Sequence, residues 1–293
     1  MSVERDLTIV IRGVGERTEA VCKKLLTEEL SANNIHLIHE APFSTALKKS
    51  YEIGLNESRK WTMVIDADVL IRPGIVTDLY HRVESSRSSI FVVQSEMLDK
   101  FFAGVRVGGI KVYRTKLLKR AIKLVADEVR PEATVIKNMH ARGFYVHISD
   151  LVCGLHDFEQ YYSDIFRKGF THGIKHAKLI DIMMPYWLRV AKKDKDFEVL
   201  IAGYQLGSQH AGKLKLDKDE TEDMFRSYMQ KTKLKEKPKL AASSFSTAEV
   251  GSMVDNFAPP PEYAKVKAEI DSWGRPSVPT GLNLRRIISL LGR

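Results

Sequence analysis

The sequence predicts an α/β protein whose sheet is mostly parallel and is flanked by helices. Short, apolar, β-branched runs alternate with stretches at helical spacing through the first half of the chain. Polar residues suited to binding and catalysis follow directly after two of these runs, and no strand is predicted after residue 148. Because parallel strands need helical crossovers, this alternation favours a largely parallel sheet, followed by a helical C-terminal extension.

The expected elements follow from apolar periodicity and from turn residues. The first run is β-branched and is bounded by Gly13 and Gly15, which favours a buried strand, and Pro73 fits the first turn of a helix. Strands are predicted at 7–11, 35–38, 61–65, 89–93, 110–113 and 144–148. Helices are predicted at 16–30, 47–55, 73–83, 117–122, 131–142 and 158–176.

The second part of the chain has a different pattern. Packed helices are predicted at 180–190 and 199–206, with no further strand rhythm. A Lys-rich stretch at 231–239 and three prolines at 259–261 indicate a linker near 231–262. The predicted domains are therefore 1–178, which carries the candidate site, and a mainly helical extension, 179–293.

Composition narrows the class of protein. The chain has 293 residues, 44% hydrophobic and 28% charged, which is typical of a soluble globular protein. A net charge of +9 favours an anionic partner, although most such charge lies on solvated faces in ordinary proteins. Basic residues are interleaved with acidic ones, so no nucleic-acid partner is expected.

The cysteine count and the apolar runs bear on location. Cys22 and Cys153 show neither metal-ligand nor disulfide spacing, which fits a reduced, cytoplasmic protein. No uncharged apolar stretch reaches the roughly 18 residues that span a bilayer. An apolar segment flanked by arginines, 282–293, fits either peripheral contact with the inner face of a membrane or docking onto its own domain.

The strongest chemical signal is the sequence WTMVIDADVLIRP, which places Asp66 and Asp68 at the end of an apolar strand. Two carboxylates one residue apart are oxygen ligands suited to Mg²⁺ or Mn²⁺. A divalent ion there could hold a diphosphate and neutralise the charge that grows on it as a bond breaks. The alternative is that one aspartate only caps the helix that begins near Pro73.

A second stretch follows the first predicted strand. Arg12, Gly13 and Arg17 lie in the sequence RGVGER, directly after the run 7–11. Ligands bind beyond the carboxyl ends of strands in open α/β sheets, and glycine allows close backbone approach, so these residues are candidates to contact a nucleotide or phosphate. A plain strand-to-helix turn is the alternative reading, because Gly13 and Gly15 lack the third glycine of a dinucleotide fingerprint.

With these motifs in place, residues 6–178 resemble the Rossmann-like GT-A fold of glycosyltransferases, especially the family-2-like ones. The resemblance is carried by WTMVIDADVLIRPG, by GGIKVYRTKLL at 108–118, by RPEATVIKNMHARGF at 130–144 and by GLHDFEQYYSDIFRKGF at 154–170. It implies that Glu132 is the catalytic base and that His156 is a late ligand of the metal or diphosphate. The residues alone allow the same roles, since a helix N-terminus keeps a carboxylate ionised and a neutral imidazole can bind a metal. Glu132 could equally cap its helix, and His156 could be a structural hydrogen-bonding residue.

Some features depart from the family pattern. Pro131 precedes Glu132 where the family has a Glu-Asp pair, and RGVGER replaces the commoner Pro-x-Tyr-Asn, so neither the nucleobase nor the sugar is implied. A Gln-x-x-Arg-Trp motif does not occur, which excludes a processive polysaccharide synthase of that type. The resemblance therefore implies a single, inverting, Mn²⁺- or Mg²⁺-dependent transfer from a nucleoside-diphosphate sugar to a glycan or a lipid-linked acceptor.

Two other functions remain open on the sequence. A haloacid-dehalogenase-type phosphatase also places Asp-x-Asp after an apolar strand and would use Asp66 as nucleophile, although Leu70 stands where that family expects Thr or Val. A non-catalytic basic protein on a transferase scaffold would account for the net charge.

Overall fold

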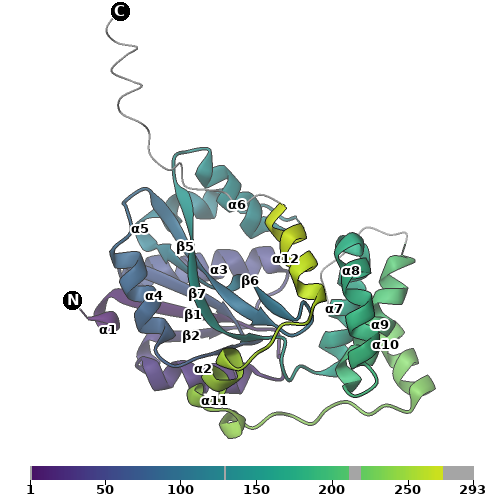
Figure 1. Ribbon diagram of the computed structural model, residues 1–293. Helices are drawn as coiled ribbons and strands as arrows, with labels where there is room; N and C mark the ends of the chain where they lie inside the picture. Colours follow the sequence, from purple (N-terminus) through teal and green to yellow (C-terminus); the bar gives the residue numbers. More distant parts are fainter. Residues whose placement is uncertain (1, 129, 211–218, 273–293) are drawn as a thin grey trace, which may run out of the picture.

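The computed structural model describes residues 2–128, 130–210 and 219–272 (Figure 1). Seven strands form one sheet in the order β2-β1-β3-β6-β5-β7-β4. The strands are β1 (Leu7–Arg12), β2 (Ile35–Ile38), β3 (Trp61–Asp66), β4 (Val69–Ile71), β5 (Ile90–Asp99), β6 (Gly104–Arg114) and β7 (Tyr145–His156).

The direction of the strands confirms the predicted fold class. β1 pairs in parallel with both β2 and β3, and β5 pairs in parallel with β7. β6 joins these two groups by antiparallel pairing with β3 and β5, and β4 pairs antiparallel with β7 at the edge. Only β6 and β4 therefore run against the other strands, so the sheet is mostly parallel and its main strands end on the same side.

Helices cover both faces of the sheet (Figure 1). One face packs against α2, α4 and α11, and the other packs against α3, α5 and α6. These helices are α2 (Glu19–Glu29), α3 (Phe43–Glu57), α4 (Ile75–Glu84), α5 (Thr115–Ala121), α6 (Pro131–His140) and α11 (Thr247–Asp255). A short α1 (Val3–Asp6) precedes β1, and 3₁₀ helices occupy Ala32–Asn34, Ile122–Leu124 and Ala242–Ser244.

A second hydrophobic core lies beside the sheet. It is formed by helices α7 (Tyr162–Lys175), α8 (Ala177–Val190), α9 (Lys195–Ser208), α10 (Asp219–Thr232) and α12 (Glu262–Ser272). Phe101, from the connection between β5 and β6, and Trp187 of α8 are both fully buried in it. This core includes α7, which precedes residue 178, so the division into 1–178 and 179–293 stays a prediction.

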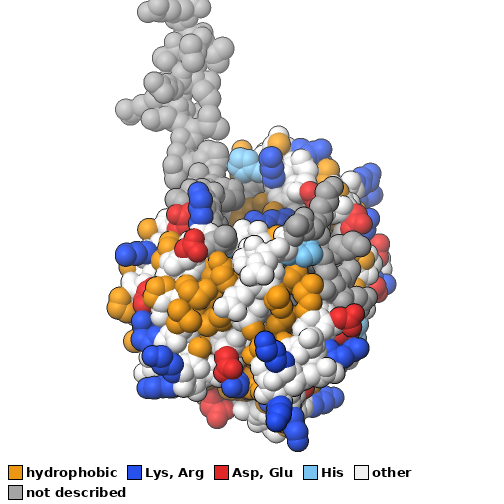
Figure 2. Space-filling model, turned by 90° about the vertical axis from the view of Figure 1, so that its right-hand side faces the viewer, with side chains coloured by type: hydrophobic (Ala, Val, Ile, Leu, Met, Phe, Trp, Pro, Cys, Tyr) orange, Lys and Arg blue, Asp and Glu red, His pale blue; other side chains and the backbone are white. Residues whose placement is uncertain are grey.

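Two helices of the second core approach closely enough to exclude side chains. A Cβ at Gly169 of α7 would lie 2.1 Å from the Leu200 carbonyl oxygen, and one at Gly203 of α9 would lie 2.1 Å from the Phe166 carbonyl oxygen. The glycines therefore let the two backbones touch. Figure 2 shows the side of the molecule that carries the helical extension, where hydrophobic side chains gather and most Lys and Arg side chains lie nearer the margins.

The segment predicted as a linker, 231–262, runs back along the sheet and contains α11. Ser246 and Glu249 form a reciprocal capping box at its start, and Val250 is fully buried in the main core. In the described part of the chain, no helix is both long and apolar enough to cross a bilayer. The segment 282–293, predicted to contact a membrane, lies outside the described residues.

The edge strand β4 was not predicted, and it places Asp68 next to the end of β7. β7 is also longer than expected, since it continues to His156, which is paired with Val69. Gly154 permits this pairing: its φ is +151°, and a Cβ there would lie 1.9 Å from the Leu70 carbonyl oxygen. The close approach of two backbones therefore requires glycine at this position.

Candidate functional site

The two aspartates of the Asp-x-Asp motif point to different partners. Asp66 is the last residue of β3 and lies opposite Arg12, the last residue of β1, whose Nε donates to Asp66 Oδ1 at 2.8 Å. Asp68 follows the turn into β4, and its Oδ2 lies 3.4 Å from His156 Nε2 at the end of β7. The structure thus brings Asp68 and His156 together, as predicted for a metal site, but not Asp66.

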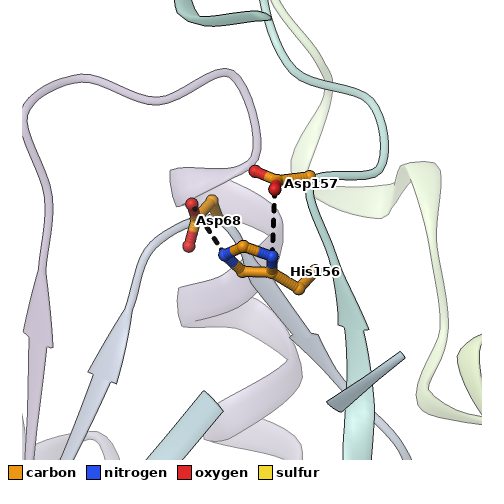
Figure 3. Close-up of side chains that lie close together, drawn as sticks. All are labelled: Asp68, His156 and Asp157. Atoms are coloured by element: carbon orange, nitrogen blue, oxygen red, sulfur yellow. Dashed lines mark ion pairs between the residues drawn. The ribbon is translucent and has the colours of Figure 1, made fainter. Parts of the chain in front are cut away.

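Asp157 takes the place that the sequence reading gave to Asp66. Its Oδ2 lies 3.0 Å from His156 Nδ1, and one ligand atom from each of Asp68, His156 and Asp157 fits within 4.8 Å (Figure 3). Asp157 adopts φ +66°, an uncommon backbone conformation that asparagine and aspartate tolerate best. We call these three residues the Asp68 cluster.

A further carboxylate fixes the orientation of the histidine ring. Asp99, only 1% exposed, lies with Oδ2 2.8 Å from His156 Nδ1, and its Oδ1 accepts the backbone N–H groups of Phe101 and Phe102. Arg106 Nε donates to the same carboxylate at 2.7 Å. Burial alone would raise the pKa of Asp99, but Arg106 and His156 outweigh it and hold that pKa well below its usual value. Asp99 is therefore a permanent anion that turns Nε2 of His156 toward Asp68.

The cluster fits a divalent cation. Asp68 Oδ1 is buried and has no hydrogen-bond partner among the described residues, so it is an oxygen with capacity for a ligand. Burial would lower the pKa of His156, but Asp157 and Asp68 raise it well above its usual value, so the ring carries a proton when no metal competes for it. Two carboxylates and an imidazole suit Mn²⁺ and related ions. Residues Asp68, His156 and Asp157 would hold such an ion, which would replace the proton on the ring.

A lysine supplies positive charge at the same place. Lys168 Nζ contacts Asp157 Oδ1 and lies 3.7 Å from Asp68 Oδ2. Burial disfavours its charge, but Asp157 and Asp68 raise its pKa above the usual value. The ammonium group therefore balances the carboxylates and would have to share them with a bound metal ion.

Asp68 and Asp157 of the cluster line a cavity of about 320 Å³, which we call the metal cavity. Its walls combine acidic and basic side chains. The acidic ones are Glu16, Asp68, Asp157 and Asp164, and the basic ones are Arg130, Arg167, Lys168 and Lys175. Carboxylates beside several cations can hold a metal ion together with a phosphate-bearing ligand.

Arg12, Asp66 and Glu132 form a second cluster, which is internally paired. Arg12 Nη1 lies 3.2 Å from Glu132 Oε1, which also accepts from the Tyr113 hydroxyl at 2.7 Å, and Lys111 Nζ lies 2.9 Å from Glu132 Oε2. Burial would raise the pKa of Glu132, but Lys111 and Arg12 outweigh it and lower that pKa to about 2. Both oxygens of the predicted base are thus engaged by cations or by a hydroxyl. Asp66, the nucleophile of the phosphatase alternative, is likewise held by Arg12.

The predicted nucleotide loop is tied to distant parts of the chain. Arg17 donates to the Pro238 carbonyl oxygen at 2.8 Å and to Glu159 Oε2 at 2.6 Å. The Gly13 N–H donates to the Ile38 carbonyl at 2.9 Å. These bonds fix the loop beside the metal cavity, and a contact of Arg12, Gly13 or Arg17 with a nucleotide stays a prediction.

The sequence reading missed several residues of the site. Asp157 follows His156 directly, and Glu16 lies within RGVGER, so both are sequence neighbours of predicted site residues. Burial, with Asp68 as a neighbouring charge, raises the pKa of Glu16 to about 7. Asp99 and Lys168 carried no signal in the sequence, because their contacts with His156 and Asp157 are tertiary.

The chain is similar to known proteins only at the level of solved structures. No family model and no curated protein matches the chain. Among solved structures, a glycosyltransferase involved in glycosylation of the major capsid of PBCV-1 is 14% identical and covers 50% of this chain and 82% of its own, with a TM-score of 0.35. CMP:2-keto-3-deoxy-manno-octonic acid synthetase complexed with CTP is 11% identical, with 50% and 90% coverage and a TM-score of 0.36. The 4-diphosphocytidyl-2C-methyl-D-erythritol synthase of Anaerococcus prevotii is 9% identical, with 54% and 91% coverage and a TM-score of 0.38.

The matches span about half of this chain. At TM-scores of 0.35 to 0.38 they follow its sheet only loosely. The chemistry is therefore argued from the side chains of this chain.

Proposed function

We propose that the protein is a metal-dependent glycosyltransferase that uses a nucleoside-diphosphate sugar as donor. The observation that carries this proposal is the Asp68 cluster at the wall of a cavity that also carries four basic side chains. Asp68 Oδ1 of this cluster has no hydrogen-bond partner among the described residues. Such a cavity suits a cation and a diphosphate held side by side.

The residues in and beside the metal cavity would have different roles in binding the donor. Arg130, Arg167 and Lys175 supply positive charge for an anionic diphosphate. A divalent ion, when bound, would neutralise the charge that develops on the leaving diphosphate. Asp99 keeps the His156 ring oriented, since it holds Nδ1 at 2.8 Å.

In the transfer itself, the bond between the anomeric carbon and the diphosphate oxygen breaks, and its electron pair leaves with the nucleoside diphosphate. The acceptor oxygen forms the new bond to that carbon, and its proton passes to a carboxylate. Two carboxylates are candidates for this step. Glu132 is the one that the family resemblance implies, and Glu16 has a pKa of about 7 and lines the metal cavity.

A binding experiment tests the proposal. Titration calorimetry of the full chain with ADP, CDP, GDP and UDP, each with and without Mn²⁺, should show metal-dependent binding of at least one nucleotide. Asp68→Asn should abolish that binding, because it removes a charge from the cation site. Asp78→Asn, an exposed aspartate on α4, is the matched control and should leave binding unchanged. Metal-independent binding, or equal effects of the two variants, would refute the proposal.

A further inference from the structure

A second, larger cavity of about 620 Å³ lies beside the metal cavity, between the sheet, α6 and α12. Its volume is within the range of small-molecule sites. We call it the apolar cavity because hydrophobic side chains from separate elements line much of it. These are Phe102, Val107, Ala133, Ile136, Val146, Ile148, Leu179 and Ile270.

The charges around the apolar cavity have one sign. The described residues that line it include Arg106, Arg130 and Lys137 but no aspartate or glutamate. Arg106 is paired with Asp99, but no ion pair joins Arg130 or Lys137 to any acidic group within 2–128, 130–210 and 219–272. The metal cavity differs, since both carboxylates and basic groups line it.

The two cavities meet at a shared wall. Arg130, His172 and His176 line both of them, and Lys175 lies on the side of the metal cavity. Burial and the positive charge of Arg130 lower the pKa of Lys175 to about 8. The neighbouring carboxylates therefore do not fully neutralise the positive charge at this wall.

The shared wall also offers an unused hydrogen-bonding atom. His172 is 8% exposed, and its Nδ1 has no hydrogen-bond partner in the described part of the chain. Burial, together with His176 and Lys168, holds the pKa of His172 well below its usual value, so the ring is neutral. A buried polar atom without a partner is costly, and a ligand that spans the wall would satisfy it.

We infer that the apolar cavity binds the acceptor, and that this acceptor is an anionic amphiphile: an apolar group that carries a phosphate or carboxylate. The apolar group would fill the space between the sheet, α6 and α12, and the anionic group would lie at Arg130 on the shared wall. This inference rests on the proposed function for the word acceptor, but the binding site itself does not depend on it.

Calorimetry on the full chain with three probes tests the site: octyl phosphate below its micelle concentration, 1-octanol and inorganic phosphate. Octyl phosphate should bind at least roughly tenfold more tightly than either fragment, because it combines buried methylenes with an ion pair. Ala133→Trp should weaken octyl phosphate and 1-octanol roughly tenfold or more, since the indole fills the cavity from an exposed helix position. Ala141→Trp, just beyond α6 and outside the cavity, is the matched control.

A charge variant separates the two parts of the ligand. Arg130→Gln should weaken octyl phosphate severalfold and leave 1-octanol unchanged, whereas Arg142→Gln, an exposed arginine outside the cavity, should affect neither. If octyl phosphate binds no better than inorganic phosphate, or if the two tryptophan variants behave alike, the inference is wrong. If the unmodified protein binds octyl phosphate but shows no Mn²⁺-dependent nucleotide binding, only the proposed function is overturned. If it shows Mn²⁺-dependent nucleotide binding but does not bind octyl phosphate, only this inference is overturned.

Discussion

Only one residue separates Asp66 and Asp68 in the sequence, but their carboxylates belong to two different clusters in the structure. Around Asp66, the Arg12 guanidinium is shared between the Asp66 and Glu132 carboxylates, and Glu132 is also paired with Lys111. Around Asp68, one carboxylate oxygen has no partner among the described residues, and the cluster lines a cavity. A closed network holds strands together, whereas an incompletely satisfied one can accept a ligand.

The two clusters differ in what supplies the counter-charges of their buried groups. Burial would lower the pKa of Arg12, but Asp66 and Glu132 raise it above its usual value, so the cluster of Arg12, Asp66 and Glu132 contains its own counter-charges. At the Asp68 cluster, Asp99 joins Asp68 and Asp157 around a single imidazole, and protonation of His156 balances the three carboxylates together with Arg106 and Lys168. A divalent ion can supply the same charge.

The largest expected effect is a loss of stability when the cluster of Arg12, Asp66 and Glu132 is disrupted. Glu132→Gln leaves Arg12 and Lys111 without their shared carboxylate and should lower the free energy of unfolding by about 3–5 kcal/mol. The folded pKa of Glu132, about 2, lies below the ordinary 4.5, so the stabilisation is present above pH 4.5 and is lost as pH falls toward 2. Urea unfolding should show a difference in free energy of unfolding between the unmodified protein and the variant that is smaller at pH 3 than at pH 7. An equal difference at both pH values would mean that the ion pairs contribute nothing.

Metal affinity should depend on the two aspartates unequally. Asp68→Asn should weaken Mn²⁺ binding at least about 100-fold, since it removes a direct ligand, and Asp66→Asn should weaken it much less. Electron paramagnetic resonance of free Mn²⁺ measures both dissociation constants. If Asp66→Asn is the more damaging variant, the ion binds at the Arg12 side and the two clusters have been assigned the wrong way round.

An intermediate effect is expected from the residue behind the histidine. Asp99→Asn removes the anion that orients His156 and should lower Mn²⁺ affinity about 10- to 100-fold. A purely structural role would not change the pKa of His156, so its titration by NMR is the second measurement. That pKa should fall in the variant, because the Asp99 carboxylate, 2.8 Å from Nδ1, favours the charged form of the ring. Asp150→Asn, at an exposed position, is the control.

The smallest effect concerns Glu16. Its folded pKa of about 7 is raised above the ordinary 4.5, so ionising it costs stability, and the metal-free protein should lose stability as pH rises from 4.5 to 7. Glu16→Gln should flatten that dependence in thermal unfolding scans, and an unchanged slope would show that Glu16 ionises normally.

The same substitution also tests the base. If Glu16→Gln abolishes transfer while Glu132→Gln, measured at a temperature where it is folded, retains it, then Glu16 accepts the proton. The opposite pattern would keep Glu132 in that role.

The sequence by itself determined the alternation of strands and helices, because each buried strand is a short apolar run and each helix shows its own periodicity. It also placed Asp66 at a strand end, and the family resemblance implied a shared site for Asp68 and His156, whose side chains lie 3.4 Å apart in the structure. These signals are local or depend on strand order, so they can be read along the chain.

Only the tertiary structure decided which carboxylate faces the cavity. Asp66 ends β3, the chain then turns, and β4 runs antiparallel to the end of β7, so Asp68 meets His156 while Asp66 meets Arg12. No periodicity encodes that turn, because the pairing of β4 depends on the missing side chain of Gly154. Asp99 reaches His156 across 57 residues of sequence, a contact set by the packing of β5 against β7.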